Sequence, residues 1–166
     1  SKISFFIIIV SGIIYILLTK RYTFIPSVFI PTVVLISIYF VIEKKKKLNP
    51  TYGIYVQIVF WLNLIGEYYF YYHWIYYDKL LHFVIPMFIA IAIYNYFEIH
   101  SKFVSKKVLV FFAVLGIGAA FEIFEYAQSG FFNFPSVGVY ANTTLVMPPY
   151  QDTIWDLIYQ CLGTGT

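Results

Sequence analysis

The sequence is poor in charged residues and in cysteine. Asp, Glu, Lys and Arg together make up 11% of the 166 residues, whereas soluble domains carry roughly 25%. No long polar segment interrupts the apolar runs, so a separate soluble domain is not expected. Cys161 is the single cysteine, which excludes an intramolecular disulfide and a metal site built from cysteines.

Several enzyme classes are excluded by residues and motifs that the sequence lacks. Three His and a single Arg are too few for a histidine-box desaturase or for a lipid phosphatase that binds phosphate through Arg, Lys and paired His. The G-x-S-x-G, Walker and G-x-G-x-x-G patterns are absent. The formal net charge of +3 lies in short runs beside apolar segments, so it does not indicate a nucleic-acid partner.

Long apolar runs dominate what is present. Hydrophobic residues make up 61% of the chain and the mean hydropathy is +0.77, which is typical of a polytopic membrane protein. We expect an all-α transmembrane bundle forming a single integral membrane domain over residues 1–166, with two generic spans in 1–53 and a four-span core in 54–166. The six expected spans cover residues 3–19, 24–42, 54–72, 79–97, 107–127 and 152–166.

The last expected span is short, and its length leaves two alternatives open. At 1.5 Å per residue it is about 22 Å long, less than the ~30 Å of a hydrocarbon core. Either the span continues beyond Thr166 or it crosses only part of the membrane.

The positive charges predict an orientation. Eight Lys fall on one side of the alternating topology, and Lys20, Arg21 and Lys79 fall on the other. The positive-inside rule places the N-terminus in the cytoplasm. The uncharged loop 128–151 would then lie outside, either as a lid or re-entrant segment or as a floppy connection at the interface.

Six of the eight carboxylates map to the expected outer half of the bundle: Glu67, Asp78, Glu122, Glu125, Asp152 and Asp156. Asp78 and His82 are four residues apart, as are Asp152 and Asp156, while Glu122 and Glu125 are three apart. Each pair therefore shares one face of its helix. Three helices are predicted to present polar pairs at a similar depth, toward the outer face.

Structural explanations compete with this interpretation for some of these residues. Asp78 and Asp152 stand at predicted helix starts, where a carboxylate can cap backbone amides. His82 could be an ordinary hydrogen-bonded histidine, and Glu67 could extend to the surface. Glu122 and Glu125 are harder to explain in this way, because acidic residues within spans cost about 2–3 kcal/mol and normally face a bundle interior or a water-filled cavity.

Clustered carboxylates in a low-dielectric environment bind protons or a cation. Carboxylate oxygens with one imidazole suit Zn, Mn, Mg, Ca or Fe. The candidate ligands are Asp78, His82, Glu122, Glu125, Asp152 and Asp156, with Glu67, Gln128, Gln160 and Lys79 as secondary candidates. Lys79 would either extend outward or offset a neighbouring acid. A divalent metal site and a proton-sharing network both remain open.

Three stretches resemble a known family of small membrane proteins. YYDKLLHF (76–83), FEIFEY (121–126) and QDTIWDLIYQCLG (151–163) are similar to the YjdF-like family and, more distantly, to the VanZ-like family. The resemblance covers about residues 55–163 and implies that the six candidate ligands and Gly163 occupy motif positions. Gln160 stands where the family pattern usually has Asn, and Gln128 fits the second motif in a shifted register. The resemblance implies an architecture and no reaction.

Three functional hypotheses follow. The first is a non-catalytic subunit or scaffold of a larger membrane complex, in which the acids form either a structural metal site or a hydrogen-bond network. The second is a metal-dependent enzyme acting on a lipid or lipid-linked substrate at the outer leaflet, and the third is a cation or proton transporter. The expected partners are membrane lipid and other membrane subunits, with no nucleic acid.

Overall fold

The computed structural model describes residues 2–20, 51–100, 106–132, 138–141 and 144–165, together with single positions and pairs between residues 25 and 40. The chain divides into two compact units, Ser1–Tyr69 and Phe70–Thr166. The predicted span 24–42 lies largely outside the described residues.

The first unit contains α1 (Lys2–Thr19) and α3 (Thr51–Ile65), which contact each other, and most of the π-helix η2 (Gly66–Phe70). Its core is an apolar cluster of buried side chains: Phe5, Ile8, Tyr15, Ile36 and Phe60. Large apolar side chains such as Phe6 and Leu17 are exposed on α1, as expected for a helix that faces lipid. Lys20 ends α1 in a left-handed conformation with φ 54°, and its amide donates to the Ile16 carbonyl, a common helix C-cap.

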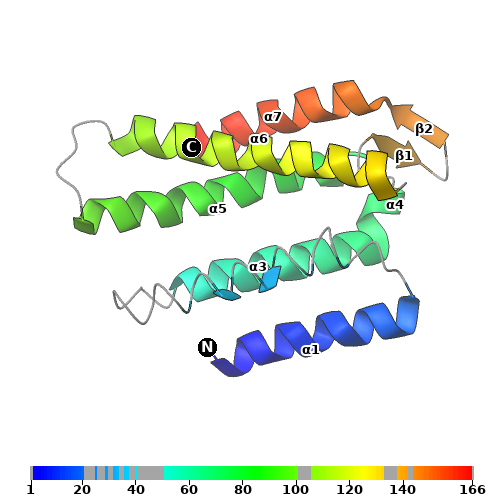
Figure 1. The fold of residues 1–166 in the computed structure, drawn as a ribbon, viewed down its shortest axis with the longest axis horizontal. Coiled ribbons are helices and arrows are strands. Elements are labelled where there is room, and N and C mark those ends of the chain that lie inside the picture. The colour runs from blue at the N-terminus through cyan, green and yellow to red at the C-terminus, as the bar shows by residue number, and fades with distance from the viewer. Residues whose placement is uncertain are drawn as a thin grey trace. The chain divides into compact units, whose positions relative to one another are not determined.

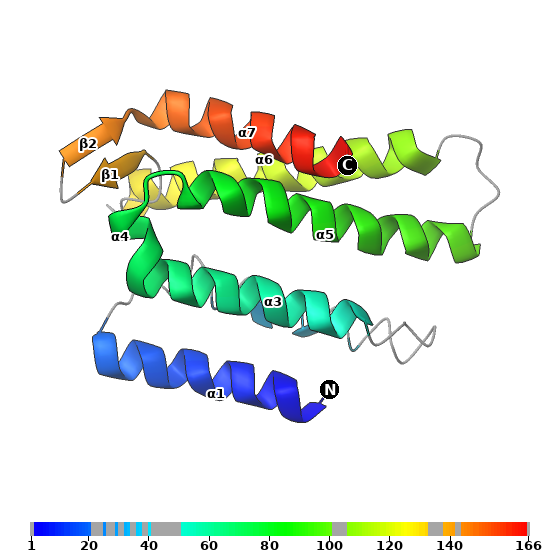
Figure 2. The same cartoon turned by 180° about the vertical axis from the view of Figure 1, so that it is seen from behind.

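The second unit contains α4 (Tyr71–His73), α5 (Tyr77–His100), α6 (Lys106–Phe132) and α7 (Pro149–Gly165). Between α6 and α7 lie the strands β1 (Val139–Ala141) and β2 (Thr144–Met147), which pair antiparallel. The three long helices contact one another in every pair. Figures 1 and 2 show α5 and α7 running in the same direction and α6 running in the opposite one, with the hairpin at the end where α5 and α7 begin.

Aromatic packing fixes the start of α5. The Tyr77 ring stacks on Phe70 with centroids 4.9 Å apart and makes an edge contact with Tyr71 at 5.5 Å. Trp74 packs against the same ring, and the Tyr77 amide donates to the Trp74 carbonyl. The first two turns of α5, which carry the polar residues Asp78, Lys79 and His82, are therefore anchored by their neighbours.

The observed helices match the expected spans only in part. Tyr77–Asn95 and Lys106–Phe131 are long and apolar enough to cross a membrane, and Phe5–Thr19 is a shorter apolar helix. The segment expected to be one span over 54–72 changes from α-helix to π-helix at Gly66. α7 begins at Pro149, slightly before the expected 152, because proline suits the first helical position. The full set of six spans remains a prediction.

The expectation of a connecting loop from residue 128 to 151 is wrong at both ends and in its middle. α6 continues to Phe132, and α7 already begins at Pro149. Between them Val139 pairs with Met147, Tyr140 with Leu145 and Ala141 with Thr144. The β-branched and aromatic residues of Val139–Ala141 and Thr144–Met147 favour strands. This preference was overlooked because the segment was interpreted by its lack of charge.

Candidate functional site

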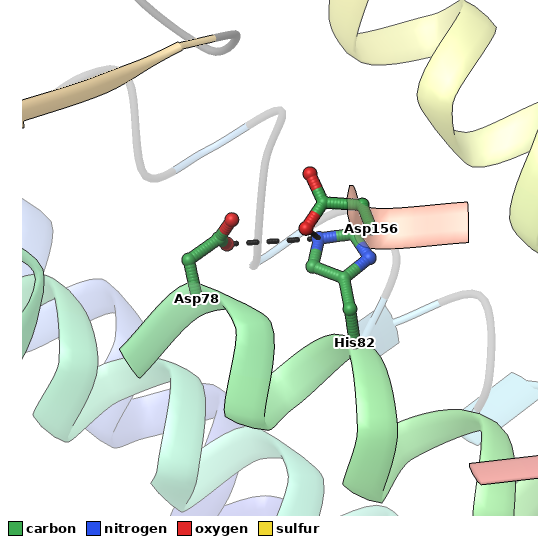
Figure 3. Close-up of side chains that lie close together, drawn as sticks. All are labelled: Asp78, His82 and Asp156. Carbon is green, nitrogen blue, oxygen red and sulfur yellow. Dashed lines mark ion pairs between the residues drawn. The ribbon is translucent and has the colours of Figure 1, made fainter. Parts of the chain in front are cut away.

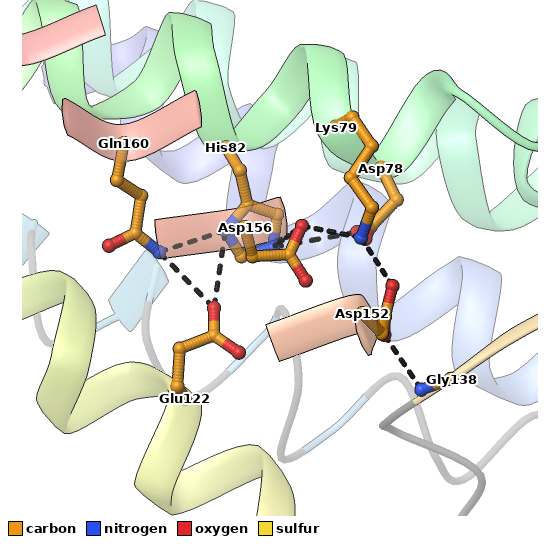
Figure 4. Close-up of polar contacts among 8 residues, drawn as sticks. All are labelled: Asp78, Lys79, His82, Glu122, Gly138, Asp152, Asp156 and Gln160. Atoms are coloured by element: carbon orange, nitrogen blue, oxygen red, sulfur yellow. Dashed lines mark hydrogen bonds and ion pairs between the residues drawn. The ribbon is translucent and has the colours of Figure 1, made fainter. Parts of the chain in front are cut away.

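Polar side chains of the three long helices converge at the hairpin end of the second unit (Figure 4). We call them the polar cluster, and they are Asp78, Lys79 and His82 of α5, Glu122 and Glu125 of α6, and Asp152, Asp156 and Gln160 of α7. The four-residue spacing places Asp78 and His82 on one face of α5, and it places Asp152, Asp156 and Gln160 on one face of α7. Because α5 and α7 both begin here, their positive helix ends favour the nearby carboxylates.

Lys79 is the cationic centre of the cluster and is only 2% exposed. Its Nζ donates to Asp78 Oδ2 at 3.1 Å, to Asp156 Oδ1 at 2.6 Å, and also to Asp152 Oδ1. Of the two alternatives for this residue, extension outward is wrong and offsetting of acids is what the structure has, because a buried ammonium must be paired. The bonds to Asp152 and Asp156 join α5 to α7, whereas the bond to Asp78 lies within α5.

Asp152 connects the cluster to the hairpin. One of its oxygens accepts from Lys79, and the other accepts from the Gly138 backbone N–H at 2.7 Å. Gly138 has φ +90°, and an added Cβ would lie 3.1 Å from the Met147 carbonyl oxygen. Gly138 was not predicted from the sequence, because the group that binds Asp152 is its main-chain N–H and not a side chain. The only sign of this position in the sequence is a glycine within an uncharged segment.

His82 lies between carboxylates of all three helices (Figures 3 and 4). Its Nε2 is 3.6 Å from Asp78 Oδ1 and 3.7 Å from Asp156 Oδ1, and its Nδ1 is 3.3 Å from Glu122 Oε1. The two ring nitrogens therefore face two different sets of carboxylate oxygens.

Gln160 links the imidazole to α6. Its Nε2 lies 2.9 Å from His82 Nδ1 and donates to Glu122 Oε1 at 3.2 Å. Gly118 makes room for this amide, because an added Cβ there would overlap Gln160 Oε1. Gly163, one turn further along α7, lies against the Phe83 carbonyl in the same way. These two glycines allow α7 to approach both α6 and α5 closely.

Among the residues that the structure describes, two groups of side chains have the geometry to hold a metal ion. In the aspartate group, Asp78, His82 and Asp156 each offer a ligand atom, and these atoms lie within 4.8 Å of one another. In the glutamate group, His82, Glu122 and Glu125 do the same. His82 belongs to both groups.

The two groups differ in how their oxygens are satisfied. In the aspartate group, Asp78 and Asp156 already bind the Lys79 ammonium. In the glutamate group, Glu122 is 4% exposed, and its Oε2 has no hydrogen-bond partner among the described residues. A buried anionic oxygen without a partner costs about 1–3 kcal/mol or more, so this oxygen is suited to bind a cation or a proton.

The remaining predicted residues have other positions. Asp152 lies in the polar cluster but in neither metal group, since it binds Lys79 and Gly138. Gln128 is buried on α6, one turn beyond Glu125. Glu67 lies in η2 of the first unit.

Comparison with known proteins gives one match. No curated protein and no solved structure matches the chain, and the resemblance to VanZ-like proteins remains a prediction. The model of one family matches residues 2–166, nearly the whole chain. Together with the apolar helices α5 and α6, this match shows an integral membrane protein, and the chain belongs to the predicted membrane protein family DUF2238.

Proposed function

We propose that this protein is a non-catalytic subunit or scaffold of a membrane complex, and that it holds a divalent cation in the glutamate group of His82, Glu122 and Glu125. The observation that carries the proposal is the buried Glu122 Oε2, which has no hydrogen-bond partner among the described residues. It belongs to a carboxylate that already faces His82 Nδ1 at 3.3 Å.

The charge of the polar cluster supports the same proposal. Its carboxylates outnumber Lys79 and His82 even when the imidazole is protonated. Uncompensated negative charges at such close range in a low-dielectric environment require a bound cation or bound protons. Carboxylate oxygens and one imidazole nitrogen together suit Mn²⁺, Zn²⁺, Mg²⁺, Ca²⁺ or Fe²⁺.

Burial supports a structural role over a catalytic one. Lys79, His82, Glu122, Asp156 and Gln160 are all less than one-tenth exposed. A catalytic metal centre keeps an open coordination position that substrate can reach. A cation bound by His82 of α5 and by Glu122 and Glu125 of α6, with Gln160 of α7 bonded to Glu122, would instead hold these helices together.

The metal content of the purified protein tests the cation site. The protein would be equilibrated with Mn²⁺ or with Zn²⁺ in detergent, separated from free metal and measured by elemental analysis. We expect one ion per chain in the wild type and a loss of at least tenfold in affinity in Glu122→Gln and Glu125→Gln. Glu67→Gln, a carboxylate change in the first unit, is the control and should retain the ion. A wild type that binds neither metal contradicts the proposal.

The subunit role needs a separate measurement. Native mass spectrometry of the protein released from its own membranes should show it bound to further membrane subunits in a fixed ratio. A protein released only as a lone chain would contradict this part of the proposal and leave the cation site untouched.

The metal-dependent enzyme is a second candidate, favoured by one observation. The Asp78 side chain is 28% exposed, so the cluster reaches the surface at one edge, and a carboxylate there could act as a general base. Turnover of a lipid-linked substrate that requires the metal and is abolished by Asp78→Asn would support the enzyme. Ion flux in liposomes that Glu125→Gln abolishes would instead support a transporter.

A further inference from the structure

We infer that Lys79 is a built-in cation that occupies the aspartate group and so limits the polar cluster to a single divalent ion. The inference rests on the cation-binding function proposed above and goes beyond it, since it explains why one of two adjacent groups would take a metal and the other would not.

The first step of the argument is the position of the Lys79 ammonium. Three aspartate oxygens from two helices converge on its Nζ, at 3.1 Å for Asp78 Oδ2, at 2.6 Å for Asp156 Oδ1, and in a third bond to Asp152 Oδ1. Converging carboxylate oxygens are also how a protein surrounds a divalent metal ion. The ammonium therefore stands where these aspartates would otherwise hold a metal.

The second step is that Asp78 and Asp156, without Lys79, would offer ligand atoms to a metal ion. Asp156 Oδ1, which accepts from Lys79, is also 3.7 Å from His82 Nε2. Asp78 Oδ1 is 3.6 Å from the same nitrogen. Removing the ammonium would leave three buried or half-buried carboxylates and one imidazole around a space that three methylenes and the Nζ had filled.

The third step is that the two groups share His82 through opposite sides of its ring. Nδ1 faces Glu122 of the glutamate group, and Nε2 faces Asp78 and Asp156 of the aspartate group. Two divalent ions in adjacent groups would repel each other, and a neutral imidazole ligates only one of them through its unprotonated nitrogen, so the other ion would be held by aspartate oxygens. A lysine charge of +1, covalently fixed in one group, reduces that repulsion and leaves the imidazole to the other ion.

Replacing the lysine tests the inference directly. Lys79→Ala removes both the charge and the bulk, whereas Lys79→Arg retains the charge and is the matched control. After equilibration with Mn²⁺, we expect one ion per chain in the wild type and in Lys79→Arg, and two in Lys79→Ala. The second ion should be lost again in the double variant Lys79→Ala, Asp156→Asn. Electron paramagnetic resonance should show broadening from neighbouring Mn²⁺ ions in Lys79→Ala alone.

Thermal stability supplies a second readout for a variant that folds poorly. If Lys79 acts as a cation, Mn²⁺ should restore the melting temperature of Lys79→Ala toward that of the wild type, with a much smaller effect on Lys79→Arg. A Lys79→Ala protein that stays unfolded with and without Mn²⁺, beside a folded Lys79→Arg, overturns the inference, because a bound ion should replace a built-in one.

The outcomes separate this inference from the proposed function. One ion in the wild type and no additional ion in folded Lys79→Ala overturns the role of Lys79 and leaves the glutamate site standing. No ion in the wild type and one in Lys79→Ala refutes the proposed function and supports Lys79 as the resident cation. No ion in either protein refutes both.

Discussion

The two compact units of this chain bury different kinds of side chain. In the described part of the first unit, the core is the apolar cluster around Phe5, Ile8 and Phe60, and Thr32 is its one buried polar side chain. In the second unit, the buried side chains include Lys79, His82, Glu122, Asp152 and Asp156. All buried charged side chains of the described residues therefore belong to the second unit.

This difference indicates that helices can associate in a membrane without buried charged side chains. In the described part of the first unit, α1 and α3 pack around an apolar cluster, and such packing is sufficient for helix association in lipid. Even within the second unit, Ala90, Val110 and Val114 form an apolar cluster between α5 and α6. The polar cluster is thus an addition that packing does not demand, and ionisable groups within membrane helices normally mark a functional site.

Among the variants that test the difference between the two units, Asp156→Asn is expected to have the largest effect on thermal stability. The change removes a carboxylate from the buried Lys79 and brings an amide close to His82. Removing one partner of a buried ion pair costs about 3–5 kcal/mol, so the melting temperature in detergent should fall steeply. Glu67→Gln in the first unit is the control, and an equal loss in both variants would contradict the special role of the cluster.

A smaller effect is expected from Gly163→Ala, because the added methyl group would overlap the Phe83 carbonyl of α5. Forcing extra atoms into a close contact costs about 1–3 kcal/mol, and here the neighbour is backbone and cannot rotate away. Gly165→Ala meets nothing within 4 Å and should leave thermal stability unchanged. Equal melting temperatures for the two variants would show that α5 and α7 do not approach so closely.

Gln160→Leu should cost about 2 kcal/mol, at roughly 1 kcal/mol for each of the two lost hydrogen bonds. The amide nitrogen donates to Glu122 Oε1, a bond that can persist when His82 Nδ1 binds the ion, and groups that orient metal ligands typically contribute about 10–100-fold to metal affinity. Titration with Mn²⁺ should therefore show weaker binding as well as lower stability. Unchanged Mn²⁺ affinity would mean that Gln160 only packs.

The smallest effect is expected in the first unit, from Ile8→Val. Ile8 is 1% exposed, and deleting one buried methylene costs about 1 kcal/mol. Because the first unit buries no charged side chain among its described residues, the metal content should stay the same as in the wild type. A change in metal content would show that the two units do not act separately in this respect.

Much of the polar cluster could be predicted from spacing alone. The four-residue interval between Asp152 and Asp156 fixes one face of α7, and the same interval fixes Asp78 and His82 on α5. The cost of charge in lipid then predicts that these faces turn toward one another. The structure brings these residues together with Glu122 and Glu125 at one end of the second unit.

Other features of the polar cluster depend on how the helices and the hairpin are placed relative to one another, which the spacing of residues in the sequence does not predict. The contact of Lys79 with Asp152 and Asp156 requires the relative rotation of α5 and α7, which Gly163 permits by close approach to Phe83. The Gly138 amide reaches Asp152 only because β1 and β2 form a hairpin. The spacing of carboxylates in the sequence predicts neither a backbone hydrogen-bond donor nor a pair of strands in an uncharged segment.

The most direct test of the cation site is anomalous scattering from crystals of the wild-type protein grown with Mn²⁺. We predict one anomalous peak per chain, in contact with His82 Nδ1, Glu122 and Glu125, and no second peak at the Lys79 position. A fully ordered cluster with no anomalous peak at His82, Glu122 and Glu125 would contradict the account.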